Sequence, residues 1–242
     1  MKNAFVIAGG SRGLGKALAK EAYALGYPVA LLARGQEDLD KAKNEILSHG
    51  EKQKFTVHAV DLSDSAATTK AFAEIEKAHG AISTLVNCMA TWIPRKKAVD
   101  LQHEDFDKSL RLNFFSAFNA IREALQLREN NKSLPLSIIN MGATASLRGG
   151  IQTSPFSVAK SALRSYSQSL AKELGPEGVH VAHLVIDGLI DNERTKGLNP
   201  DAPPENFINS ASLAKSIIHV AEQDKSCWTF EWDVRPYNEK WQ

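Results

Sequence analysis

Three glycines near the start of the chain, Gly9, Gly13 and Gly15, follow a short apolar run and precede a helical pattern. Glycine permits a tight turn and a close approach of backbone to a ligand, and a helix beginning there offers unpaired N–H groups and a positive dipole end. This arrangement suits the pyrophosphate of a dinucleotide, with a purely structural turn as the alternative. The other residues of the predicted binding turn are Ser11, Arg12 and Leu14.

A basic residue, Arg34, follows the apolar run Val29–Ala33, about 20 residues after the glycine turn. An acidic residue at this place would bind the ribose diol of NAD. A guanidinium cannot accept those hydrogen bonds, but it suits the additional 2′-phosphate of NADP, and Arg12 could supply a second cation. The sequence therefore favours NADP(H) over NAD(H) as cofactor, and two ordinary surface arginines are the alternative.

These residues need a scaffold that brings strand ends and helix starts together. Apolar runs alternate along the chain with helical patterns, and most runs are continuous, as is typical of strands covered on both faces. The alternation predicts an α/β fold, a Rossmann-type doubly wound parallel sheet in three layers. We expect strands at Ala4–Ala8, Val29–Ala33, Phe55–Val60, Thr84–Val86, Ser137–Asn140, Val179–Ile186 and Trp228–Val234, and helical spacing within 14–25, 114–125, 159–174 and 213–221.

The length of 242 residues fits a single domain, 1–242, with substrate loops expected at about 91–103 and 191–210. The net charge is +1 with both signs interleaved, so no nucleic-acid partner is indicated. No run approaches the roughly 18 apolar residues of a membrane helix. No H-E-x-x-H or C-x-x-C occurs, and no metal site is expected. A cytoplasmic protein is the expectation.

The spacing Gly9-x-x-x-Gly13-x-Gly15 resembles the T-G-x-x-x-G-x-G pattern of the short-chain dehydrogenase/reductase family, with Ala8 in place of Thr. The run 85–90, Leu-Val-Asn-Cys-Met-Ala, is similar to the family's L-V-N-N-A-G and aligns Asn87 with a cofactor-site residue. Asn113 matches its helical Asn, and 156–160 matches its Y-x-x-x-K. The resemblance covers nearly the whole chain.

In that family a Tyr transfers the proton with help from a Lys, a Ser polarises the carbonyl and an Asn holds a relay water. Here Phe156 stands at the Tyr position and Ala143 at the Ser position, so neither group is present. No tyrosine of the chain is followed four residues later by Lys. Because losing a positioned acid/base costs about 10²–10⁴-fold in rate, we expect the usual alcohol chemistry to be weak or absent.

Three residues remain as catalytic candidates. The resemblance implies that Lys160 still binds the nicotinamide ribose. Asn113 keeps either its catalytic role or only a structural bond between helix and strand. Asp187 is a possible substitute base, with a strand-end turn residue as the alternative.

Further cofactor contacts are implied by two more segments. The family's P-G-x-x-x-T is present as the run 187–192, which points to Gly188, the Ile190 backbone and Asn192 at the nicotinamide. Asp61 and Leu62 resemble the pair that touches adenine, although helix capping is an alternative role for this acidic segment.

Two functions are consistent with these residues. One is an NADP(H)-dependent oxidoreductase with an atypical site and an unknown small-molecule substrate. The other is a non-catalytic NADP(H) sensor or partner subunit of an active relative. The resemblance also implies a homodimer or homotetramer, formed through helices around 114–125 and 157–174.

Overall fold

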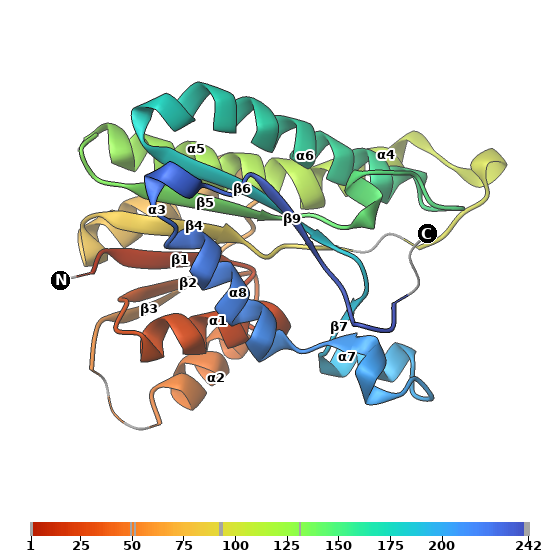
Figure 1. Cartoon of the computed structure of the whole chain (residues 1–242), viewed down its shortest axis with the longest axis horizontal. Coiled ribbons are helices and arrows are strands. Elements are labelled where there is room, and N and C mark those ends of the chain that lie inside the picture. Colours follow the sequence, from red (N-terminus) through yellow and green to blue (C-terminus); the bar gives the residue numbers. More distant parts are fainter. Residues whose placement is uncertain (1, 49, 51, 92–93, 131, 240–242) are drawn as a thin grey trace.

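One parallel sheet organises the molecule, in the strand order β3-β2-β1-β4-β5-β6-β9 (Figure 1). The computed structural model describes residues 2–48, 50, 52–91, 94–130 and 132–239. The order reverses between β1 and β4, and in such sheets ligands bind beyond the carboxyl ends of the strands at that point. The predicted fold is confirmed. The strands are β1 Ala4–Ala8, β2 Val29–Ala33, β3 Phe55–Ala59, β4 Ile82–Asn87, β5 Leu136–Met141, β6 Val179–Ile186 and β9 Glu231–Val234.

Helices cover both faces of the sheet. In Figure 1, α1, α2 and α8 lie below the sheet, and α4, α5 and α6 lie above it. Each face has its own apolar core, which explains why every residue of β1 is buried. The helices are α1 Gly13–Ala24, α2 Gln36–Ile46, α3 Ser65–His79, α4 His103–Leu110, α5 Ser116–Glu129, α6 Ser154–Leu174, α7 Glu193–Leu198 and α8 Ser210–Ala221.

The last strand is shorter than the sequence predicts. The expectation of a strand from Trp228 is wrong for 228–230, because β9 begins at Glu231. The Trp228 ring instead stacks on His180, with ring centroids 4.9 Å apart, and its Nε1 donates to the Gln223 carbonyl at 3.2 Å. The segment still lies beside β6, because the His183 N–H donates to the Phe230 carbonyl at 2.7 Å.

The two expected substrate loops are more ordered than predicted. The first, 91–103, holds a short 3₁₀ turn at Ala98–Asp100, and its residues 92–93 lie outside the described residues. The second, 191–210, contains α7 and the two-residue strand β8 Phe207–Ile208, which pairs with β7 Leu189–Ile190. The helix expected from 114 also starts earlier, with a π-helical turn at Arg111–Phe115.

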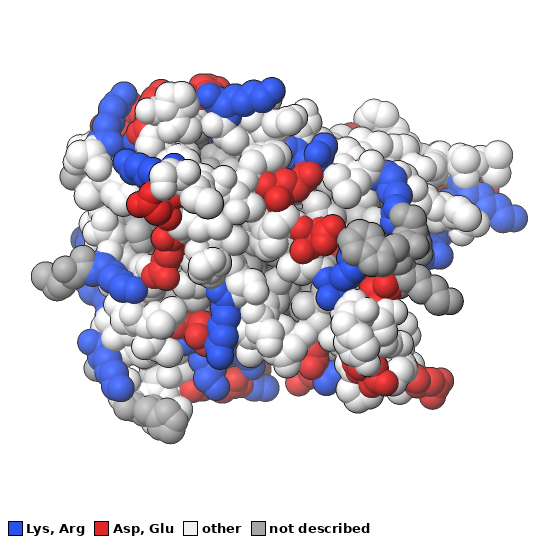
Figure 2. All heavy atoms as spheres, viewed as in Figure 1, with Lys and Arg blue, Asp and Glu red and all other residues white. Residues whose placement is uncertain are grey.

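Charges are mixed over the surface. Figure 2 shows basic and acidic side chains interspersed across one face, in line with the net charge of +1. Among the described residues, every helix is too short or too polar to cross a bilayer.

Candidate cofactor and active site

The glycine turn joins β1 directly to α1. Gly9 has a φ of +85°, and its N–H donates to the Leu32 carbonyl at 2.8 Å. A Cβ on Gly15 would lie 2.2 Å from the Gly9 carbonyl oxygen, so only glycine fits there. The helix begins at Gly13 with no side-chain cap among the described residues. Its first N–H groups therefore remain available to an anion, as the sequence predicts for a phosphate-binding turn.

Two guanidinium groups lie beside this turn. Arg12 precedes α1 with its side chain 79% exposed, and its Nε is 3.6 Å from an Asp38 carboxylate oxygen. Arg34 follows β2 and is exposed. The carboxyl ends of neighbouring parallel strands share one edge of the sheet, so Arg34 and the glycine turn after β1 occupy the same edge.

Asp61 and Leu62 follow β3 at this edge. Partial burial raises the pKa of Asp61, but hydrogen bonds from the Ser63 hydroxyl and amide and the charges of Arg111 and Arg34 outweigh it and lower the pKa. Leu62 is buried. The alternative of helix capping belongs to a different residue, because Asp64 accepts from the Ala67 N–H at 3.0 Å and caps α3.

The segment after β6 reaches the glycine turn from the other side. Asn192 caps α7 through the Thr195 N–H at 3.1 Å, and its Nδ2 donates to the Ile190 carbonyl at 3.0 Å. A Cβ on Gly13 would lie 3.5 Å from the Asn192 Cβ. Two predicted cofactor contacts that are far apart in sequence, Gly13 and Asn192, are thus neighbours in space.

Two buried side-chain hydrogen bonds link β4, β5 and α6. The Asn87 Nδ2 donates to Asn140 Oδ1 at 2.7 Å, and Asn140 Nδ2 donates to the Ser167 hydroxyl of α6 at 2.9 Å. Asn87 Oδ1 is buried without a partner among the described residues. Because an unmet acceptor in the interior is costly, this oxygen at the end of β4 favours a donor supplied by a ligand or water.

Lys160 lies at the centre of the site. It is 1% exposed, and its Nζ donates to the Met141 carbonyl at 2.8 Å and to the Met89 carbonyl at 3.3 Å. Burial lowers the pKa of Lys160 to about 8. Phe156, at the Tyr position, is buried in the first turn of α6, and its ring centroid lies 5.9 Å from Lys160 Nζ.

The position expected for the catalytic Ser adjoins a buried histidine. The Ala143 N–H donates to the Ser146 hydroxyl at 3.1 Å, and this hydroxyl lies 3.2 Å from His183 Nε2. A Cβ on Gly142 would lie 2.2 Å from the same nitrogen. Burial, then the charge of Lys160, lowers the pKa of His183 to about 4, so the ring is neutral. Sequence reasoning missed the contact between Ser146 and His183. The feature of the sequence that could have indicated it is Gly142, whose missing side chain leaves room for the His183 ring.

Asn113 makes a structural contact of the kind that the sequence analysis gave as one of its two roles. It is buried within the π-helical turn, its Oδ1 accepts from the Thr91 N–H at 2.8 Å, and its Nδ2 donates to the Thr91 carbonyl at 3.0 Å. The side chain therefore ties the helix to the segment that follows β4. The same Nδ2 also lies 3.2 Å from the Ser109 carbonyl.

Asp187 is held by two partners. Its Oδ1 accepts from the Thr144 hydroxyl at 2.7 Å, and its Oδ2 lies 2.9 Å from Arg235 Nη1. Both carboxylate oxygens are engaged by these partners, so this geometry favours a positioning role over the substitute base. Sequence reasoning missed Arg235. Next to Asp187, a Cβ on Gly188 would meet Pro236 Cδ at 2.7 Å.

The predicted site residues thus gather along one edge of the sheet, from Arg34 after β2 to Asp187 after β6. The arrangement combines a glycine turn at a helix N-terminus, two cations and one buried lysine. Within the described part of the chain, no group of three or more His, Cys, Asp or Glu side chains is placed to hold a metal ion.

Comparisons with known proteins point to the same family that the sequence motifs resemble. The family model for short chain dehydrogenases matches residues 3–203. The 3-oxoacyl-[acyl-carrier-protein] reductase of Bos taurus is 30% identical over 228 residues, which cover 92% of each chain.

Solved structures of other proteins match the fold of this chain over nearly its whole length. A short-chain dehydrogenase from Rhodopseudomonas palustris superposes with a TM-score of 0.81 at 27% identity, covering 98% of this chain and 100% of that one. A short chain oxidoreductase from Pseudomonas aeruginosa PAO1, solved with NADPH and described as containing an atypical catalytic center, gives a TM-score of 0.86 at 21% identity and covers 99% of this chain and 98% of its own. The second likeness shows the fold alone.

Proposed function

The chain belongs to the short chain dehydrogenase family, and on that basis we propose that it is an NADP(H)-dependent oxidoreductase with an atypical active site. The observation that carries the proposal is the buried Lys160, fixed by the carbonyls of Met89 and Met141, where Phe156 and Ala143 replace the usual Tyr and Ser. The Pseudomonas aeruginosa relative, bound to NADPH and described with an atypical catalytic center, supports the same combination in this fold.

The residues present fit NADP(H). Gly15 has no room for a side chain above the turn, and the α1 N-terminus carries no acidic residue in its first turn. The pyrophosphate would be held there. Arg34 and Arg12 would hold the 2′-phosphate, and Asn87 Oδ1, unpartnered among described residues, supports a ligand at the end of β4. When bound, NADPH supplies the hydride for reduction of a substrate.

Lys160 is the group we propose as proton source. An ammonium has three N–H donors, and two of them are used by the carbonyls of Met89 and Met141, which leaves one within the described part of the chain. A pKa of about 8 makes the side chain charged at neutral pH yet able to release a proton. Without Tyr and Ser to polarise an unactivated ketone, activated carbonyls or conjugated double bonds are the expected substrates.

The second candidate is a non-catalytic NADP(H) sensor or partner subunit. The observation favouring it is that Asp187, the residue considered above as a substitute base, is engaged by Thr144 and Arg235. Such a protein would bind the cofactor without turning it over.

We also propose a homodimer or homotetramer formed through α5 and α6. Phe115, the last residue of the π-helical turn before α5, is 47% exposed, and Val158 on α6 is 45% exposed. Phe114, Phe118 and Tyr166 form a cluster of ring contacts between these helices, beside Phe115. An exposed apolar rim next to an aromatic cluster suits burial by a second copy.

One experiment separates the two candidates. Calorimetry is first run with NADPH and NADH on folded protein, and NADPH oxidation is then followed with a panel of carbonyls and enones. The oxidoreductase proposal expects NADPH binding and turnover that Lys160→Met abolishes. Binding with no turnover across the panel would leave the sensor. Absence of NADPH binding would overturn both.

A further inference from the structure

The exposed apolar side chains of this protein are concentrated at one end of the sheet. In the described part of the chain, nine large apolar side chains are exposed. Six of them lie on the segments that follow the carboxyl ends of the adjacent strands β4, β5, β6 and β9, at the right-hand end of the molecule in Figure 1. Single exposed apolar residues need no explanation, but a concentration of them marks a binding surface. We call these six the edge residues: Val99, Leu147, Ile151, Leu189, Leu198 and Tyr237, with exposures between 39% and 89%.

Two hydrogen bonds tie the segments after β4, β5 and β6 to one another. The Lys96 N–H donates to the Gln152 carbonyl at 3.2 Å, which joins the segment after β4 to the segment after β5. The Thr144 hydroxyl donates to Asp187 Oδ1 at 2.7 Å, which joins the segment after β5 to the end of β6. Thr144 directly follows Ala143, the residue at the family's Ser position. The edge residues of these three segments are therefore carried by backbone that meets beside the proposed reaction centre.

The segment after β9 lies against the segment after β6. A Cβ on Gly188 would lie 2.7 Å from Pro236 Cδ, so the two chains are in close contact there. The Asn238 Nδ2 donates to Asn206 Oδ1 at 2.7 Å, which is a second link between the same segments. In both segments the residue that follows the close contact is an edge residue. All four segments that carry edge residues are thus joined at one end of the sheet.

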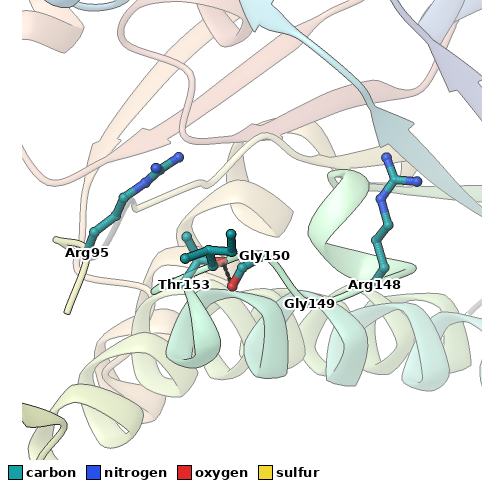
Figure 3. A pocket seen from close by; sticks show the side chains of 6 residues that line it. Arg95, Arg148, Gly149, Gly150 and Thr153 are labelled. Carbon is teal, nitrogen blue, oxygen red and sulfur yellow. Dashed lines mark hydrogen bonds between the residues drawn. The ribbon is translucent and has the colours of Figure 1, made fainter. Parts of the chain in front are cut away.

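A hollow of about 550 Å³ opens beside Ile151, which is one of its lining residues. Figure 3 shows the Arg95 and Arg148 side chains on either side of the turn that includes Gly149 and Gly150. A Cβ on Gly149 would meet no atom within 4 Å, so the space beside this turn is open. A volume of this size holds a small organic molecule, and sites for such molecules are lined mainly by apolar groups.

We propose that the edge residues bind the substrate, and that this substrate is an uncharged carbonyl compound or enone on a hydrocarbon frame. The inference rests on the proposed function, because it names the substrate class of the same site. Aliphatic side chains from four joined segments cover a hydrocarbon frame and remove it from water, whereas a charged group placed among them would lose its hydration. The carboxylate of Asp187 is already paired with the Arg235 guanidinium at 2.9 Å and is not used to select a charged substrate.

The test measures the affinity of 2-alkanones, from butan-2-one to nonan-2-one, by NMR titration with and without saturating NADP⁺. We expect the affinity to rise about two- to fourfold with each added methylene, because each one buries further apolar surface. Ile151→Ser and Leu198→Ser should each weaken the binding of nonan-2-one about three- to tenfold and leave that of butan-2-one nearly unchanged. Leu25→Ser, at an exposed leucine that follows α1 and lies outside the four segments, is the matched control and should retain binding. All three positions are exposed, and circular dichroism checks that the variants are folded.

Other occupants of this surface give different results. An affinity that is independent of chain length, or that survives both substitutions, would overturn the proposal. Octanoate is the charged probe of similar length, and tighter binding of octanoate than of nonan-2-one would overturn it as well. Self-association that is lost in Ile151→Ser, with alkanone binding unchanged, would assign the surface to a second copy of the chain. Binding to phosphatidylcholine vesicles that is lost in the same variant, again with alkanone binding unchanged, would assign it to a membrane.

Failure of the proposed function is distinguishable from failure of this inference, because alkanone binding requires no hydride transfer. Binding that depends on chain length and is lost in the two variants, without NADPH oxidation by any probe, would refute the oxidoreductase and leave the apolar ligand site standing. NADPH oxidation by short enones, with a KM that neither chain length nor Ile151→Ser changes, would keep the oxidoreductase and overturn the apolar site.

Discussion

The Asp187 carboxylate lies 2.9 Å from the Arg235 guanidinium, and this ion pair joins the turn after β6 to the residue that follows β9. Both side chains are mostly buried, at 17% and 15% exposure. The pair brings together residues from two separate parts of the sequence beside the proposed nicotinamide site. Its geometry explains how a carboxylate is accommodated where the family has a proline.

Breaking this pair should destabilise the protein. Arg235→Gln leaves the Asp187 carboxylate with the Thr144 hydroxyl as its remaining side-chain partner among the described residues, and the free energy of unfolding should fall by about 1–3 kcal/mol. Asp187→Asn combined with Arg235→Gln should cost less than the sum of the single changes, measured by urea unfolding. Strictly additive losses would show that the two side chains do not interact.

Arg34 should determine the choice between the two dinucleotides. Arg34→Gln is expected to weaken NADP⁺ binding about 10–100-fold, because a charge-assisted contact with the 2′-phosphate is lost, and to leave NAD⁺ affinity nearly unchanged. Calorimetry with both dinucleotides measures the effect. Lys20→Gln, an exposed change further along α1, is the control. Equal loss of both affinities would contradict a 2′-phosphate contact.

The buried Lys160 should make stability depend on pH. Its pKa is lowered to about 8 in the folded state, against 10.5 for the ordinary group, so the unfolded chain binds more protons between these values. Stability from this group therefore rises with pH from about 8 to 10.5, by up to about 3 kcal/mol. Denaturant titrations at several pH values, compared with Lys160→Met, isolate this effect from other groups. A constant difference across this window would refute it.

Restoring two side chains should create ordinary carbonyl reduction. Ala143→Ser with Phe156→Tyr returns a hydroxyl donor and a phenol beside Lys160, and the rate with simple ketones should rise about 10²–10⁴-fold. NADPH oxidation measures the gain, and adding Lys160→Met to the double variant should remove it. A folded, NADPH-bound double variant without any gain would show that more than these two groups are lacking.

Gly142 should tolerate no side chain while His183 is present. In Gly142→Ala the new Cβ would lie 2.2 Å from His183 Nε2 and 2.8 Å from the Leu184 carbonyl oxygen. Such overpacking should destabilise the fold by at least about 1–3 kcal/mol. Thermal unfolding measures the loss, and His183→Ala should recover part of it in the double variant. An unchanged melting temperature for Gly142→Ala would contradict the close contact.

The sequence predicts the scaffold better than the contacts around the reaction centre. The continuous apolar strands β1 and β2 were recognisable because both faces are buried. The helix α2 was missed because, apart from Leu39 and Ala42, its residues are exposed or only partly buried and give a weak periodic signal.

Contacts between residues that are far apart in sequence could not be predicted from apolar runs or periodic patterns. The Asp187–Arg235 pair spans two strand ends, and nothing in the spacing of either residue indicates the other. The same holds for Asn192 beside Gly13, where the resemblance placed each residue at the cofactor but not against its neighbour. Only the strand order brings these segments to one edge.

The tight fit between Gly142 and His183 also limits how this site can be redesigned. A Cβ at 142 would lie 2.2 Å from the His183 ring nitrogen and 2.8 Å from the Leu184 carbonyl oxygen, so a serine there would displace both a side chain and the backbone of β6. An engineered hydroxyl at 142 therefore needs a smaller residue at 183 and a shift of the backbone at 184 together.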